Sequence, residues 1–71
     1  MEIRYGAQVV DKNERILGLV DHLMRNTWSG EISKFMVRRK APAPDLFLRP
    51  EDVLEATDIR VKLKIAIDES S

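Results

Sequence analysis

The stretch that decides the fold is Ile59-Arg60-Val61-Lys62-Leu63-Lys64-Ile65-Ala66-Ile67-Asp68, near the end of the chain. Aliphatic side chains occupy its odd-numbered positions from 59 to 67, and basic side chains occupy positions 60, 62 and 64. Successive side chains of an extended backbone point to opposite faces, so only a period of two places all the odd-numbered aliphatics on one side. The pattern predicts a strand over residues 59–68 with an apolar inner face and a mostly basic outer face.

The chain has 71 residues, which allow one domain with a modest core, because chains this short bury only about 60% of their unfolded surface. We expect a single domain over residues 1–67 and a frayed tail over residues 68–71. Cysteine is absent, which excludes disulfides and thiolate metal sites. The start lacks the apolar stretch of a signal peptide, and no apolar run reaches the ~18 residues of a membrane span. A soluble, cytoplasmic protein without membrane insertion is expected.

The net charge of the chain does not indicate which class of partner it binds. The 12 basic and 12 acidic side chains cancel, so no overall field draws the protein to nucleic acid or to an anionic membrane. The apolar fraction of 44% is enough for a core, which argues against disorder throughout the chain.

The first part of the chain contains two segments of clearly extended character. A short apolar run over residues 7–10 predicts a strand, and the small polar residues 11–15 predict a turn after it. Residues 31–39 predict a half-buried strand, with one set of alternate side chains on each face. The inner face carries Ser33, Phe35 and Val37, and the outer face, which keeps some apolar side chains, carries Ile32, Lys34, Met36 and Arg38.

The segment Arg15 to Arg25 is ambiguous from its local pattern. Ile16, Leu19, Val20 and Leu23 match the spacing of an amphipathic helix. Gly18 opposes this reading, because glycine costs an exposed helix about 1 kcal/mol relative to alanine. Strand alternation is also imperfect, so the pattern by itself leaves helix and strand open.

Turn signals separate the later elements. Residues 27–30 predict a hairpin bend, with Gly30 free to adopt positive φ. Pro42 and Pro44 lack an amide donor and therefore exclude a central strand, so residues 41–45 are expected to form a loop. Extension resumes over residues 46–48, and Pro50 to Leu54 resembles a single helical turn with acids near its positive end.

The order of these signals resembles the PRC-barrel superfamily, the small β-barrel found in a subunit of bacterial photosynthetic reaction centres and in a ribosome maturation factor. The matching segments are Gly6-Ala7-Gln8-Val9-Val10-Asp11, Ile16-Leu17-Gly18-Leu19-Val20-Asp21, Ser29-Gly30-Glu31-Ile32, Phe35-Met36-Val37-Arg38 and Leu46-Phe47-Leu48-Arg49-Pro50-Glu51-Asp52-Val53. The resemblance implies that residues 16–25 form the second strand. It also implies a mainly β fold, a small single-domain barrel of about six short strands, that serves as a binding or assembly module.

No residues stand out as catalytic or metal-binding machinery. His22 is the sole histidine, and a single ligand leaves the coordination of zinc unfilled, so a structural or solvent-facing role is favoured. The opening Asp11, Asn13 and Glu14 suggests a calcium loop, but the glycine and the distal glutamate of that loop are missing. Adjacent acids at 51 and 52 are explained by the helix start. We therefore expect neither enzymatic activity nor a cofactor.

The preferred hypothesis is a module that binds a protein partner and forms a homodimer. A tryptophan at a hairpin tip either folds back over the barrel or anchors a contact, and folding back is slightly favoured in so small a protein. Met36, Ile32 and residues 46–48 are expected to leave an apolar patch for self-association. The edge of the last strand is a second candidate, although closure of the barrel within one chain would remove that edge. The candidate partner contacts are Trp28, Ile32, Met36, Arg38 and Arg39.

The alternative hypothesis is an RNA- or ribosome-associated factor. Two basic clusters would form a phosphate-binding stripe if the fold made them neighbours, with Trp28 or Tyr5 as a stacking group. The residues of this stripe are Arg38, Arg39, Lys40, Arg60, Lys62 and Lys64. Because the net charge is zero, a solvated surface is favoured over nucleic-acid binding.

Overall fold

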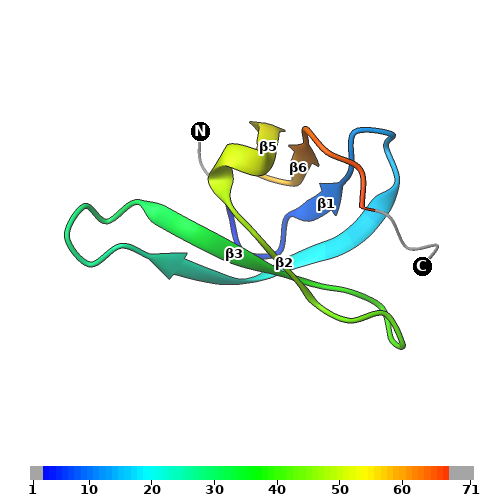
Figure 1. The fold of residues 1–71 in the computed structure, drawn as a ribbon, viewed down its shortest axis with the longest axis horizontal. Helices are drawn as coiled ribbons and strands as arrows, with labels where there is room; N and C mark the ends of the chain where they lie inside the picture. Colours follow the sequence, from blue (N-terminus) through cyan, green and yellow to red (C-terminus); the bar gives the residue numbers. More distant parts are fainter. Residues whose placement is uncertain (1–2, 68–71) are drawn as a thin grey trace.

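The computed structural model describes residues 3–67, which form a mainly β domain. Its elements are β1 (Gln8–Val10), β2 (Ile16–Arg25), β3 (Ile32–Arg38), β4 (Leu46–Leu48), the 3-10 turn η1 (Pro50–Asp52), β5 (Val53–Ala56) and β6 (Arg60–Leu63). The strands form one sheet in the order β4-β3-β2-β1-β6-β5, which curls into a half-barrel (Figure 1). The expected mainly β class and the number of short strands are confirmed. The tail expected over residues 68–71 lies outside the described part.

The sheet topology places the first and last strands side by side, away from the edges of the sheet. Strand β1 pairs with β6 in parallel, and the other neighbouring strands pair antiparallel. Strand β6 therefore has β1 on one side and β5 on the other, and the edges of the sheet are β4 and β5. The expectation that the last strand offers an unpaired edge is wrong.

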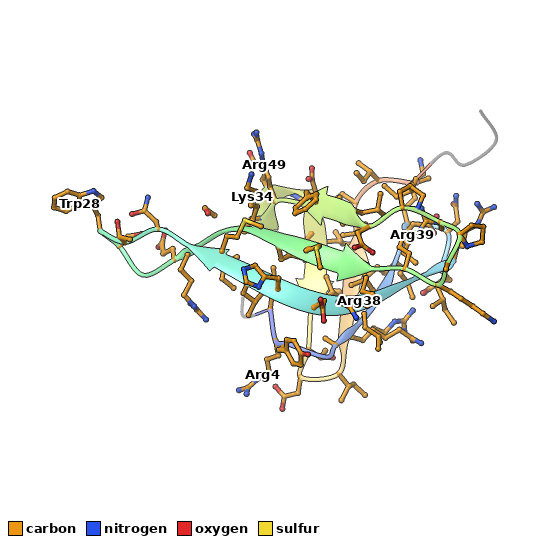
Figure 2. All side chains as sticks on the ribbon, turned by 90° about the horizontal axis from the view of Figure 1, so that it is seen from below. Arg4, Trp28, Lys34, Arg38, Arg39 and Arg49 are labelled. Carbon is orange, nitrogen blue, oxygen red and sulfur yellow. The ribbon has the colours of Figure 1, made fainter. Side chains whose placement is uncertain are left out.

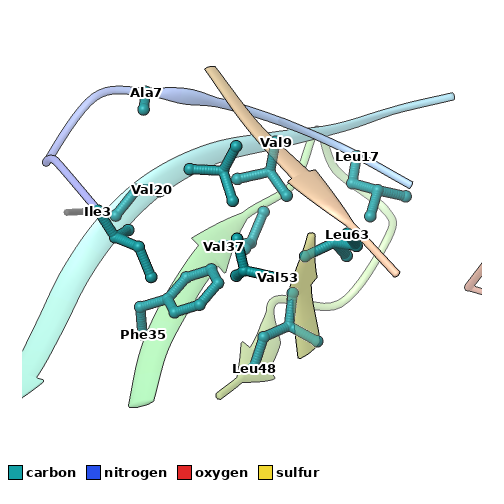
Figure 3. Close-up of a cluster of buried hydrophobic side chains, with 11 residues drawn as sticks. Ile3, Ala7, Val9, Leu17, Val20, Phe35, Val37, Leu48, Val53 and Leu63 are labelled. Carbon is teal, nitrogen blue, oxygen red and sulfur yellow. The ribbon is translucent and has the colours of Figure 1, made fainter. Parts of the chain in front are cut away.

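The core fills the concave side of the curled sheet (Figure 3). Phe35 and Val37 of β3 pack there with Val61 and Leu63 of β6, and all four side chains have no exposed surface. Ile3, which precedes β1, is also buried in this cluster. Burial of apolar side chains contributes about 1.5–3 kcal/mol each, so these positions dominate the stability of the domain.

The strand predicted over residues 59–68 is shorter in the structure. Only Val61 and Leu63 are buried within β6, whereas Ile59 lies in the preceding turn with 78% of its surface exposed. After Leu63 the backbone leaves the sheet, because the amide of Lys64 donates to the carbonyl of Asp52 and the carbonyl of Ile65 accepts from the amide of Lys12. Ile65 is consequently exposed, whereas Ile67 is partly buried against the core, so the prediction of one continuous apolar face is wrong at Ile59 and Ile65.

Strand β2 resolves the ambiguous segment, and the strand reading is confirmed. Its alternation is imperfect because the register with β1 and with β3 shifts. Val20 lies opposite Val37 and His22 lies opposite Met36, so Asp21 is an extra residue in β2. Such bulges displace the apolar residues from strict alternation, which explains why the sequence also fits a helical spacing.

Two further segments differ from the expectations. A register shift opposite the end of β2 turns Ile32 inward, so it is partly buried against the core rather than on the outer face. The predicted helical turn over residues 50–54 is confirmed only as η1, because Val53 and Leu54 already belong to β5. Strand β5 was not predicted, since its few residues lack clear alternation.

Candidate interaction site

The distal half of the β2–β3 hairpin projects from the sheet as an arm. Strand β4 pairs only with residues Phe35 to Val37, so the arm beyond them consists of two strands and a turn. Figure 2 shows Trp28 at the far end of this arm, away from the remainder of the domain. The tryptophan has 96% of its surface exposed, which contradicts the expectation that it folds back over the barrel.

Hydrogen bonds within the turn hold the tip in one shape. The side-chain oxygen of Asn26 accepts from the amide of Trp28 at 2.8 Å and from the amide of Ser29 at 3.3 Å. The Asn26 carbonyl accepts from the Gly30 amide at 2.8 Å, and Gly30 adopts φ +75, which only glycine adopts at little cost. Asparagine at the first position of a turn favours this geometry. The indole is therefore presented on an ordered turn.

A second exposed apolar group lies on the outer face at the base of the arm. His22, Met36 and Phe47 are register partners across β2, β3 and β4. Phe47 is exposed and Met36 is half-buried, whereas Leu48 beside them faces the core. The predicted patch is therefore reduced to Met36 and Phe47, because Ile32, Leu46 and Leu48 pack in or against the core.

The five predicted partner contacts do not form one surface. Trp28 stands alone at the tip, and Met36 and Arg38 share the outer face of β3. The guanidinium of Arg38 pairs with the carboxylate of Asp21 at 2.9 Å. Arg39 follows the strand and is half-buried, and its amide donates to the carboxylate of Asp45 at 3.3 Å.

One residue of each basic cluster lies on a common row across the sheet. Arg38 is opposite Leu19, Leu19 is opposite Gln8, and Gln8 is opposite Arg60. Three strand spacings separate the two arginines, which amounts to about 14 Å. The fold thus brings Arg38 and Arg60 to the same face, whereas Arg39 and Lys40 follow the end of β3 and Lys64 follows the end of β6.

Two acidic side chains, Glu14 and Asp21, neutralise much of this row. Glu14 pairs with Arg60 and, at 3.1 Å, with the ammonium of Lys62. Glu14 has φ 66 within the turn that precedes β2, and that turn carries its side chain over the basic residues of β6. The carboxylate of Asp21 likewise pairs with the guanidinium of Arg38. No sequence signal points to these pairs, because the partners lie far apart in the chain.

Neither metal ligation nor a membrane helix is found within residues 3–67. No group of three or more acidic or histidine side chains there is arranged to hold a metal ion. His22 is exposed on the outer face of β2. No described helix has the length and hydropathy to cross a bilayer.

Comparison with known protein families finds no match to this chain, and comparison with curated proteins finds none either.

Proposed function

We propose that this protein is a non-catalytic interaction module of PRC-barrel type, which self-associates and binds a protein partner through the tip of the β2–β3 arm. The observation that carries the proposal is the exposed Trp28 on an ordered turn. Tryptophan is enriched among the residues that dominate binding energy at protein interfaces.

The energetics favour a binding role for this side chain. Burying about 200 Å² of an indole at about 25 cal/mol per Å² yields about 5 kcal/mol before the costs of association. The hydrogen bonds that Asn26 accepts reduce the ordering cost of binding, because they already hold the backbone of the turn in one conformation. Protrusion on an arm also allows the indole to enter a recess of a partner.

Self-association is supported by the outer surface of the sheet. The net charge of zero removes long-range repulsion between copies, and the edge strand β4 carries the exposed Phe47. A cytoplasmic location fits the absence of cysteine from the sequence and is part of the same proposal.

The nucleic-acid alternative has one observation in its favour, the common row of Arg38 and Arg60, and one against it, the ion pairs with Asp21 and Glu14. A gel shift on single-stranded RNA at low salt separates the two functions. A salt-sensitive shift that Arg38→Glu with Lys62→Glu abolishes would support the alternative. Absence of a shift would remove it.

Capture from the native host tests the proposed function. Tagged wild-type protein, Trp28→Ala and Tyr5→Ala are compared by quantitative mass spectrometry. Tyr5 is the matched control, because it is also an aromatic residue with most of its surface exposed, but it lies outside the arm. We expect a defined set of proteins that Trp28→Ala loses by about tenfold or more and Tyr5→Ala retains. Equal recovery with all three would contradict binding through the tip.

A further inference from the structure

The free edge of β4 offers backbone groups of one residue to another chain. Val20 directs its backbone groups toward the segment that leads into β1, since its amide donates to the carbonyl of Ala7 and its carbonyl accepts from the amide of Gly6. Val37, opposite Val20, therefore directs its own groups toward β4. Its partner Leu46 faces β3, and by alternation the amide and carbonyl of Phe47 point to the open side.

The sequence around this strand is symmetric about Phe47. It runs Pro44-Asp45-Leu46-Phe47-Leu48-Arg49-Pro50. An antiparallel pairing of two such segments centred on Phe47 places proline opposite proline, leucine opposite leucine, and phenylalanine opposite itself. The same register places each aspartate opposite the arginine of the other copy.

We propose that β4 is the dimerisation strand, pairing antiparallel with β4 of a second copy about a two-fold axis through Phe47. This inference rests on the self-association in the proposed function and names the surface that carries it. The two-fold operation generates each contact twice, as isologous interfaces require. The six-stranded sheets of the two copies then join at their edges.

The charges select the register. Asp45 and Arg49 are exposed, and Figure 2 shows Arg49 extending from the margin of the sheet at the end of β4. The guanidinium of Arg49 is 3.9 Å from Glu51, a contact that leaves both side chains largely solvated. A shift of the register by one residue would place core-facing side chains of one copy opposite outer-face side chains of the other, and a shift by two would place Asp45 opposite Phe47 or Glu51. Only the register centred on Phe47 satisfies charges and apolar residues together.

The neighbouring turn limits the length of the pairing. The amide of Arg49 donates to the carboxylate of Asp52 at 3.2 Å, and the carbonyl of Arg49 accepts from the amide of Asp52 at 2.9 Å. Backbone bonds between copies are thus restricted to the amide and carbonyl of Phe47. The stacked phenylalanines and the paired charges supply the remaining contacts, so the dimer is one of modest affinity.

A charge-swap series read by sedimentation equilibrium tests the register. We expect Asp45→Arg and Arg49→Asp each to weaken the dimer by about tenfold or more, because each places like charges opposite one another twice. The double variant Asp45→Arg with Arg49→Asp restores complementarity and should recover dimerisation. Asp58→Arg, a reversal at an exposed carboxylate away from β4, is the matched control and should leave it unchanged.

A cysteine at the two-fold axis provides an independent test. The natural chain lacks cysteine, so Phe47→Cys forms a disulfide only between copies. Residues opposite each other in a hydrogen-bonded pair have Cα atoms about 5.5 Å apart, within the range that a disulfide spans. We expect rapid oxidation of this variant to a covalent dimer and slow oxidation of Leu54→Cys, an exposed position on the opposite edge strand.

The outcomes separate the inference from the function on which it rests. The β4 interface is overturned if the wild-type protein and both single charge-reversal variants dimerise equally well and Phe47→Cys oxidises no faster than Leu54→Cys. Self-association itself would then still stand. A wild-type protein that remains monomeric at about 0.1 mM overturns both, while leaving partner binding by Trp28 to be judged by capture.

Discussion

Gly18 lies against the backbone of Arg38: a Cβ at position 18 would be 2.1 Å from the Arg38 carbonyl oxygen. The same Cβ would lie 2.9 Å from the carbonyl carbon, and backbone atoms cannot move aside as the end of a flexible side chain can. This close approach allows β2 and β3 to remain paired where the sheet curls.

Gly18→Ala is therefore expected to lower the free energy of unfolding by about 2–4 kcal/mol, measured by urea denaturation. Gly6→Ala is the control, because Gly6 has φ +86 but no atom within 4 Å of its missing Cβ. That variant should cost only about 1–2 kcal/mol, the strain of a left-handed residue. An equal cost for both would contradict the steric account of Gly18.

Leu63→Ala and Ile59→Ala test which aliphatic residues of the last strand matter. Leu63 has no exposed surface and packs in the core, so its truncation should cost about 2–5 kcal/mol. Ile59 is largely exposed, and its truncation should change stability by less than about 0.5 kcal/mol. Thermal denaturation of both variants checks this difference. A similar loss of stability in the two variants would contradict the structure and support the continuous apolar face that the sequence alone predicts.

Asp11 organises the turn between β1 and β2. Its buried carboxylate accepts from the amides of Asn13 at 2.8 Å and Arg15 at 2.9 Å. Asp11→Ala should cost about 1–3 kcal/mol, because both amides lose their acceptor. Asp11→Asn keeps an oxygen in place and should cost less in the same denaturation experiment. If the two substitutions were equally damaging, hydrogen bonding would not be the reason for this aspartate.

Asn26→Ala tests whether the arm tip is preorganised. Removing the side-chain oxygen leaves the amides of Trp28 and Ser29 without this acceptor, so we expect faster motion of the indole at little cost in stability. Time-resolved fluorescence anisotropy of the sole tryptophan measures that motion. Thr27→Ala, at the neighbouring position of the tip, should leave the anisotropy unchanged. Unaltered decay in Asn26→Ala would show that other contacts order the tip.

The sequence predicted the parts of the fold that rest on local chemistry. Turns at Asp11 and Gly30 and the loop around Pro42 follow from side-chain hydrogen bonding, positive φ and the missing amide, which act within a few residues. Alternation correctly predicted the burial of Phe35 and Leu63. These signals do not depend on how the strands assemble.

Features set by long-range packing were not predictable. The internal position of β6 depends on its parallel pairing with β1, and the bulge at Asp21 depends on the register with β3. The pairing of Glu14 with Lys62 has the same cause, because the fold joins residues that are remote in sequence. The prediction that Trp28 folds back over the barrel was wrong, because the sequence does not reveal that the hairpin extends beyond the sheet and leaves this side chain exposed.

The fluorescence emission of Trp28 tests the central claim most directly, because no other tryptophan contributes to the signal. In the isolated protein we predict emission typical of a solvated indole with ready quenching by acrylamide. Titration with a purified partner obtained by capture should shift the emission to shorter wavelength and protect it from the quencher. Emission and quenching that remain unchanged when the partner is saturating would contradict an interaction made through the tip of the arm.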